Sequence, residues 1–195
     1  MSLKRIVKMR QFDSVLSEIR SRSDFSDYFE KQFCIWFLKN DHYWKTKIKS
    51  IWLWDDWPGR WGPDSGIDSI FETPDGEIWA VQSKCYDPKY QVSKKDIDKF
   101  ISESGRPAIN KRLLMATTNK IDRRAKETIR NQEKPVVSIL LRDFQSSGVV
   151  FPSDLSALKG KTEKTEPPIE RPYQKRAISA VVKGFESSAR GQLIM

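Results

Sequence analysis

A carboxylate, an amide and a lysine stand close together in the middle of the chain, on either side of a predicted turn. These residues are Asp68, Gln82 and Lys84. Oxygen atoms of Asp68, of the Gln82 amide and of the Ser83 carbonyl are ligands of the kind that Mg²⁺ prefers. Such an ion polarises a phosphate and lowers the pKa of a bound water, while Lys84 would hold that water and offset charge on the phosphate oxygens. The set is suited to phosphodiester hydrolysis without a covalent intermediate.

A tight turn is predicted between two β-prone runs, at the sequence TPDGE of residues 73–77. Pro74 suits the first central position of a type I turn, because its ring fixes φ near the required value. Gly76 suits the left-handed residue that follows in a three-residue hairpin loop. The two runs therefore form a β-hairpin.

The turn also sets which residues face each other across the hairpin. If Thr73 pairs with Glu77, counting outward places Asp68 opposite Gln82. Opposed residues point to the same face of a sheet, with Cβ atoms roughly 5 Å apart. Lys84 lies two residues beyond Gln82 and so shares that face. The turn chemistry alone predicts a cluster of the three polar side chains.

Two interpretations of this cluster stay open from spacing alone. An Asp opposite a Gln, with a Lys nearby, also fits an ordinary solvated sheet face. Against that interpretation, Gln82 and Lys84 end the apolar run of residues 78–81, where a core strand tolerates polar groups least.

Alternating helices and strands surround the predicted hairpin. An amphipathic helix is predicted at 8–20, and a second runs from Ser23 or Ser26 to about Asn40, with Glu30 beside its apolar stripe. The period-two pattern of residues 44–49 predicts a strand with a basic face. Further along the chain we expect a helix capped by Ser93 with Asp96, a strand at 112–118, a basic helix at 122–131 and a strand at 136–141. This order predicts an α/β fold, a three-layer sandwich with a mixed central sheet.

Composition narrows the possible chemistry. The chain has 195 residues with a net charge of +9, which favours a polyanionic partner. His42 is the only histidine, and Cys34 and Cys85 are the only cysteines, which excludes Ser–His–Asp catalysis, multi-His metal sites and a disulfide framework. No stretch is apolar enough to span a membrane, and the charged start lacks a secretory signal, so we expect a cytoplasmic protein.

Two further features each allow two interpretations. Four tryptophans in the segment 52–61 form either a platform for stacking nucleotides or a small aromatic core. The basic residues of the helix predicted at 122–131 either hold DNA phosphates or form a solvated helix face. The basic residues are Arg123, Arg124, Lys126 and Arg130.

The segments GPDSGIDSIF and WAVQSK resemble the Mrr-like branch of the PD-(D/E)xK nuclease superfamily, whose pattern is Gly-x-Asp on one strand and Gln-x-Lys on the next. The resemblance spans roughly residues 23–142. It implies a Mg²⁺-dependent DNA endonuclease with Asp68, Gln82 and Lys84 as catalytic residues. Glu30 is implied as an extra metal-site carboxylate. Most of the wider superfamily has an acid in place of Gln82, so one anionic ligand fewer is expected.

Asp64 is a rival for the role of Asp68, because Pro63-Asp64 spells the first letters of the superfamily's name. On the predicted register Asp64 lies four residues further out, beyond Gly66 and off the strand pair. Asp68 is therefore the preferred catalytic carboxylate, and Asp64 is expected to act only as a carboxylate further from the metal.

The C-terminal part has a different composition. We predict a nuclease domain over residues 1–151, a polar linker over 152–170 and, over 171–195, the start of a helicase-like ATPase domain. The sequence RPYQKRAI followed by GQLIM is similar to the segment before the nucleotide-binding loop of superfamily 2 helicases, which implies that Gln174 contacts adenine. The glycine-rich phosphate loop is absent, so ATP is expected only in a longer enzyme.

A nuclease followed by such a translocase resembles type ISP restriction–modification enzymes. That resemblance implies double-stranded DNA as substrate, and as partners the translocase, methyltransferase and target-recognition parts of the same polypeptide. By itself the chain is expected to be monomeric. The alternative is a module that binds DNA, or docks onto the translocase, without cleaving.

Overall fold

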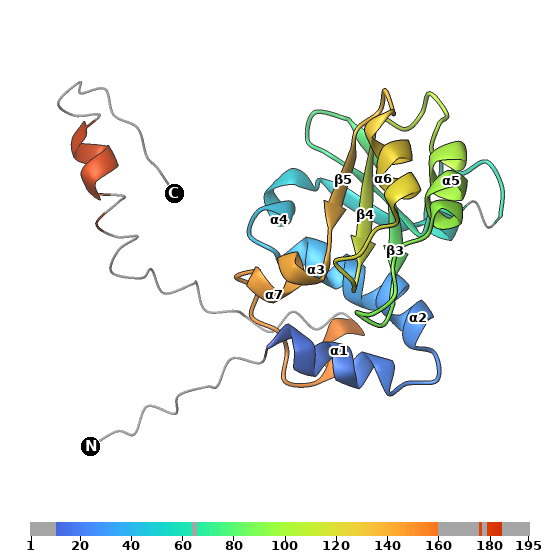
Figure 1. Cartoon of the computed structure of the whole chain (residues 1–195). Helices are drawn as coiled ribbons and strands as arrows, with labels where there is room; N and C mark the ends of the chain where they lie inside the picture. The colour runs from blue at the N-terminus through green and yellow to red at the C-terminus, as the bar shows by residue number, and fades with distance from the viewer. Residues whose placement is uncertain (1–10, 64–65, 160–175, 177–178, 185–195) are drawn as a thin grey trace, which may run out of the picture. The chain divides into compact units, whose positions relative to one another are not determined.

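The computed structural model describes residues 11–63, 66–159, 176 and 179–184 (Figure 1). The chain divides into two compact units, residues 1–163 and 164–195. In the second unit the described residues are helical. No helix within the described ranges has both the length and the apolar character needed to cross a bilayer.

A five-stranded mixed sheet forms the centre of the first unit. Its order is β1-β2-β3-β4-β5; β2 runs antiparallel to both of its neighbours, β1 and β3, whereas β3, β4 and β5 run parallel. The strands are β1 (Ser50–Leu53), β2 (Ser69–Glu72), β3 (Ile78–Lys84), β4 (Lys111–Ala116) and β5 (Val136–Ile139).

Helices cover both faces of this sheet. One face is covered by α1 (Phe12–Arg20), the continuous run α2 (Phe25–Tyr28), η1 (Phe29–Phe33) and α3 (Cys34–Asn40), and α7 (Leu141–Ser146). The other is covered by α5 (Lys94–Glu103) and α6 (Arg123–Arg130). Short helical turns are α4 (Trp44–Lys47), η2 (Trp54–Asp56) and η3 (Leu155–Lys159). The predicted three-layer α/β sandwich with a mixed sheet is confirmed.

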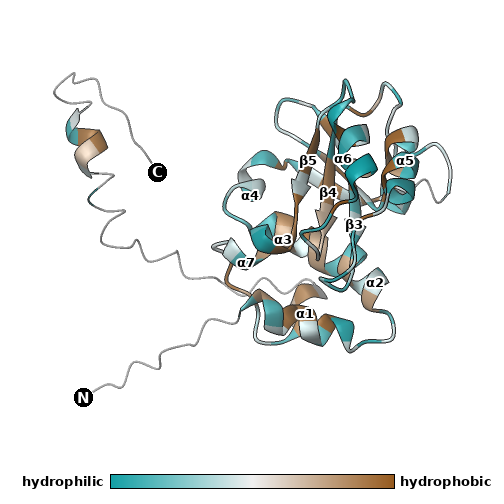
Figure 2. Cartoon of the chain, viewed as in Figure 1, coloured by the Kyte–Doolittle hydropathy of each residue, from teal (hydrophilic) through white to brown (hydrophobic). Residues whose placement is uncertain are grey.

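Alternate residues of β3 face the two halves of the core. Val81 packs with Phe33 and other side chains of the N-terminal helices, whereas Ala80 packs with Phe100 of α5. In Figure 2, β4 is largely brown, whereas the helices on the two faces of the sheet carry both brown and teal segments, as expected for a strand covered on both faces. Residues with even numbers at the end of β3 therefore point to the side of α5 and α6.

The hairpin forms as its turn residues predict. The Gly76 N–H donates to the Thr73 carbonyl at 3.0 Å, and Gly76 has a φ of 84°, which only glycine adopts without strain. The Thr73 N–H donates to the Glu77 carbonyl at 2.9 Å, and the register continues through Ser69 opposite Val81. The predicted register is confirmed.

The helical run over residues 25–40 contains a π-helical turn, η1. Buried residues come in adjacent pairs, and the pair Tyr28–Phe29 is followed five residues later by Phe33–Cys34. A step of five residues exceeds the 3.6-residue turn of an α-helix, so one wider turn is needed to keep both pairs in the core.

The strand predicted over residues 44–49 is wrong, because residues 44–47 form the helical turn α4. The side chain of Asp41 accepts the N–H groups of Tyr43 (3.0 Å) and Trp44 (3.1 Å) and so starts the turn. Trp44 is buried against Phe71, and this packing overrides the alternating pattern.

The linker predicted at 152–170 is wrong for its first part. Leu155 and Leu158 are buried in η3, and the Tyr28 hydroxyl donates to the Leu155 carbonyl at 2.6 Å. The first folded unit therefore extends past residue 151, at least to Lys159. The rest of the predicted linker lies outside the described residues, as does Gln174.

The tryptophans after β1 form an aromatic core. Trp54 and Trp57 are buried, and Trp61 meets both rings edge to face. The Trp54 indole N–H donates to the Gly62 carbonyl at 2.9 Å. The structure thus favours packing over a nucleotide-stacking platform, and the cluster fixes the loop that leads to Asp68.

Candidate active site

Asp68 lies where β2 begins to pair with β3. Its backbone N–H donates to the Val81 carbonyl at 2.9 Å, and its carbonyl accepts the Trp54 N–H at 3.0 Å. Its carboxylate atom Oδ2 accepts the backbone N–H of Ser83 at 2.5 Å and the Gln82 side-chain Nε2 at 2.8 Å. If β2 began earlier in the chain, one of its backbone carbonyls would accept the Ser83 N–H. Here the Asp68 carboxylate accepts it instead.

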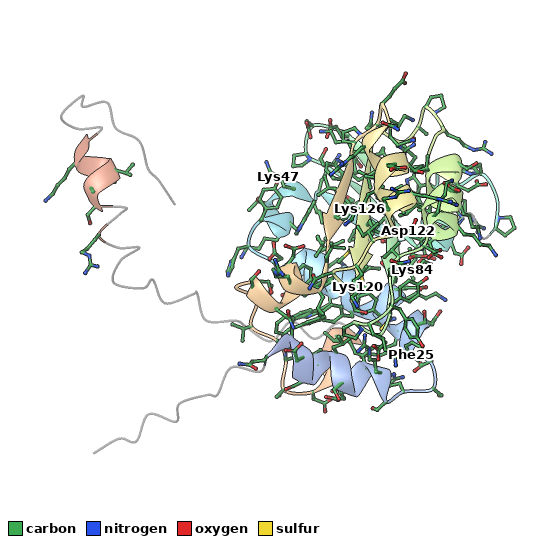
Figure 3. All side chains as sticks on the ribbon, in the orientation of Figure 1. Phe25, Lys47, Lys84, Lys120, Asp122 and Lys126 are labelled. Carbon is green, nitrogen blue, oxygen red and sulfur yellow. The ribbon has the colours of Figure 1, made fainter. Side chains whose placement is uncertain are left out.

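Gln82 and Lys84 occupy the last part of β3, at the carboxyl end of the parallel strands. Gln82 is buried and contacts Asp68, as the register predicts. Lys84 pairs with Ala116 of β4, and its carbonyl accepts the Thr117 N–H at 3.0 Å. Figure 3 shows Lys84 at this end of the sheet. The positive charge of Lys84 acts on the carboxylates of both Asp68 and Glu30.

Glu30 reaches the same end of the sheet from the π-helical turn η1. Ser26, one turn earlier, donates its hydroxyl to Glu30 Oε1 at 3.1 Å. Phe29 beside it is fully buried and anchors the turn to the core. Turns of this kind occur frequently at functional sites.

The two carboxyl groups resist ionisation. Burial raises the pKa of Asp68 to about 7, and the negative charge of Glu30 adds to the rise, while the Ser83 N–H, Lys84 and Gln82 oppose it. Burial likewise raises the pKa of Glu30, against the charge of Lys84 and the Ser26 hydrogen bond. Partly buried carboxyl groups with shifted pKa values are typical of functional sites.

The donor set fits a hard divalent cation. Because Oδ2 of Asp68 takes both hydrogen bonds, Oδ1 is left to coordinate, and Oε1 of Gln82 accepts no hydrogen bond from the described residues. A cation would offset the like charges of Glu30 and Asp68. Within the described ranges no three His, Cys, Asp or Glu side chains gather into a metal-binding group, so the set is poor in anionic ligands.

Sequence reasoning assigned no part in the site to Arg20, Tyr86 or Asp96. The Arg20 guanidinium, at the end of α1, donates to the Tyr86 carbonyl and to Thr117 Oγ1. The Tyr86 hydroxyl donates at 2.9 Å to Asp96, whose carboxylate also caps α5 and interacts with Lys84. The capping pattern identified Asp96, but no sequence signal pairs it with Tyr86 or links Arg20 to the strand ends.

Two other residues that the sequence analysis assigned to the site are Asp64 and Ser83. Asp64, the rival carboxylate, lies outside the described residues. The Ser83 side chain is buried on the face opposite to Gln82, toward Cys34, so the backbone of Ser83 is the part that faces the site.

Comparison with known proteins identifies the family to which the chain belongs. The family model described as "Restriction endonuclease" (Mrr_cat_2) matches residues 39–159. No curated protein matches the chain. Among solved structures, the chain is similar to the ATP-dependent type ISP restriction–modification enzyme LlaBIII bound to DNA, with 26% identity and a TM-score of 0.66, covering 95% of this chain and 12% of that one.

Two other solved structures are more distant. The DNA modification-dependent restriction endonuclease AspBHI has 18% identity and a TM-score of 0.45, covering 91% of this chain and 40% of that chain. The MspJI restriction endonuclease in complex with a 27-mer oligonucleotide has 15% identity and a TM-score of 0.42, covering 93% of this chain and 36% of that chain. The chain thus spans about an eighth of the length of LlaBIII. Because the family model covers more than half of its residues, this chain belongs to the Mrr-like family of restriction endonucleases.

Proposed function

We propose that the chain is a Mg²⁺-dependent endonuclease domain that hydrolyses phosphodiester bonds of double-stranded DNA, with Asp68, Gln82 and Lys84 as its catalytic residues. The observation that carries the proposal is the Asp68 carboxylate, which accepts hydrogen bonds from Ser83 and Gln82 and is affected by the charge of the half-buried Glu30. The restriction endonuclease family supports the reaction class.

The metal would be held by Asp68 Oδ1, Gln82 Oε1 and the Ser83 carbonyl, with Glu30 as a further carboxylate. The Ser83 carbonyl lies on the same strand edge as its N–H and hence on the side of Asp68. A bound divalent cation supplies Lewis acidity toward the phosphate and a lowered pKa for water.

Each protein group has a separate part in the reaction. Lys84 donates hydrogen bonds to the attacking water and to the phosphate oxygens, which orients the water and offsets the negative charge that develops. The Gln82 amide fixes the orientation of the Asp68 carboxylate through its 2.8 Å hydrogen bond.

We further propose that this domain is the nuclease part of an ATP-driven translocating restriction–modification enzyme in the cytoplasm. The similarity to LlaBIII supports this context. Residues 171–195 would then begin the translocase, with Gln174 contacting adenine when ATP is bound by the longer enzyme. In that enzyme, DNA cleavage would follow translocation.

Plasmid nicking in the presence of Mg²⁺, or of Mg²⁺ and ATP with the longer enzyme, tests the proposal. Lys84→Ala should lower the nicking rate by about 100-fold or more, the effect of losing one electrostatic catalytic group. Lys111→Ala is the matched control, because Lys111 stands at the opposite end of the neighbouring strand and pairs with Glu77. Equal nicking by Lys84→Ala and wild type would overturn the proposed mechanism.

A second candidate function is a DNA-binding or docking module that does not cleave. The observation in its favour is Gln82 in place of an acid, together with the small number of carboxylates at the described site. Calorimetric titration with Mg²⁺ separates the two candidates. A nuclease site should bind the ion in wild type and lose it in Asp68→Asn, whereas a module without cleavage should show no binding in either.

A further inference from the structure

A stripe of positive charge begins beside the candidate active site and follows α6. After β4 ends at Ala116, next to Lys84, the chain passes through Lys120 and enters α6 at Arg123. The Lys120 backbone carbonyl accepts the Val92 N–H at 2.9 Å, which ties this segment to the loop that follows β3. Figure 3 shows Lys84 and Lys120 at the same end of the sheet, with Lys126 further along α6.

The buried side of α6 fixes the direction of its basic residues. Ala125 is fully buried against the sheet, and Ile129, one turn later, packs in the same cluster. Arg123, Lys126 and Arg130 are exposed, and their spacing of three and four residues aligns them along one outer face. We call these three residues the α6 stripe.

The α6 stripe carries a net positive charge. Within the described part of the chain, none of its three side chains forms an ion pair, and one exposed acid, Glu127, lies on the same side of the helix, four residues after Arg123 and three before Arg130. By contrast, lysines at the opposite end of the sheet are compensated: Lys49 pairs with Glu72 at 2.7 Å and Lys111 with Glu77 at 2.8 Å. The stripe is therefore a source of net positive potential that begins near the active-site end of the sheet.

We propose that the α6 stripe binds successive phosphates of the DNA duplex that flanks the scissile bond. This inference rests on the proposed function. From Arg123 to Arg130 the helix axis advances about 10 Å. Phosphates of one DNA strand follow each other about every 3.4 Å of duplex axis, so the stripe matches about three of them. Contacts of this kind position the duplex without reading its sequence.

The test measures duplex affinity across a range of salt concentrations with the 195-residue chain and a fluorescently labelled DNA duplex. The variant carries Arg123→Gln, Lys126→Gln and Arg130→Gln, since glutamine keeps helix propensity and these side chains are exposed. Each lost phosphate contact should reduce the slope of log affinity against log salt by about 0.9, or about 2.7 for three. Between 50 and 200 mM salt, wild type should then lose about 40-fold more affinity than the variant.

The control removes the same three charges elsewhere, as Lys47→Gln, Lys49→Gln and Lys111→Gln. Lys47 lies at the opposite end of the sheet in Figure 3, with its ammonium 5.6 Å from the centre of the Tyr43 ring. This variant should keep the wild-type slope. Equal slopes for the α6 variant and wild type would overturn the inference while leaving the proposed function intact, provided that wild type still nicks plasmid. Absence of both binding and nicking in wild type would overturn both.

Discussion

Replacing the half-buried carboxylate Asp68 by asparagine should make the protein more stable at alkaline pH while removing its activity. Folding raises the pKa of Asp68 from 3.8 to about 7, chiefly through burial and then through the charge of Glu30. Since one pKa unit corresponds to about 1.4 kcal/mol, the ionised carboxylate destabilises the folded state by about 4 kcal/mol above pH 7. Asparagine carries no charge and avoids this penalty.

The sign of the effect depends on pH. Below pH 3.8 the carboxyl is protonated in both folded and unfolded chains, so no penalty exists. Between 3.8 and about 7 only the folded chain keeps the proton, and the wild type loses stability as pH rises through this window. Asp68→Asn should therefore match wild type near pH 4 and exceed it at pH 8.

Calorimetric melting over a pH series, without divalent cations, measures this difference. For a folded unit of this size, about 4 kcal/mol corresponds to roughly 10 °C in Tm. Asp75→Asn is the control: Asp75 is exposed in the hairpin turn and its pKa is lowered, so it stays ionised over the same window. If the melting temperatures of wild type and Asp68→Asn ran parallel across the series, the assigned burial and charge coupling of Asp68 would be refuted.

Two further changes follow from the same geometry. Glu30→Gln removes the negative charge that helps to raise the pKa of Asp68. The pH midpoint of Mg²⁺-dependent nicking should therefore move to lower pH. A midpoint that is unchanged or higher would contradict the electrostatic effect of Glu30 on Asp68. Gly76→Ala should lower the free energy of unfolding by about 1–2 kcal/mol in denaturant titration, because φ is +84° while the added Cβ meets no atom within 4 Å. Gly62→Ala, equally open but without a positive φ, should change stability by less than about 0.5 kcal/mol, and equal losses in both would argue against backbone strain.

Short-range turn chemistry made the centre of the site predictable. Pro74 and Gly76 fix the hairpin loop, and from the loop the register carries Asp68 to Gln82 without further information. The capping box of Ser93 and Asp96 likewise places the start of α5 as predicted. These features depend on residues that are neighbours in sequence.

Features that depend on tertiary packing were not predictable in the same way. Trp44 packs in the core against Phe71 and Trp79, and residues 44–47 therefore form a helical turn although their sequence alternates like a strand. Leu155 and Leu158, three residues apart in a polar segment, pack on the N-terminal helices because those helices leave apolar surface to cover. The sharing of one site by Asp68 and Glu30 depends equally on how η1 crosses the sheet.

The wide turn at Phe29–Phe33 has a consequence for how this domain can change over evolutionary time. Removing one residue there would restore a uniform helix and rotate everything before it by about 100° relative to α3. Either the aromatic pair Tyr28–Phe29 would lose its packing in the core, or Glu30 would point away from Asp68. Insertions and deletions of a single residue in this segment should be selected against even where substitutions are tolerated, so the length of the helix is itself an inherited constraint on the proposed site.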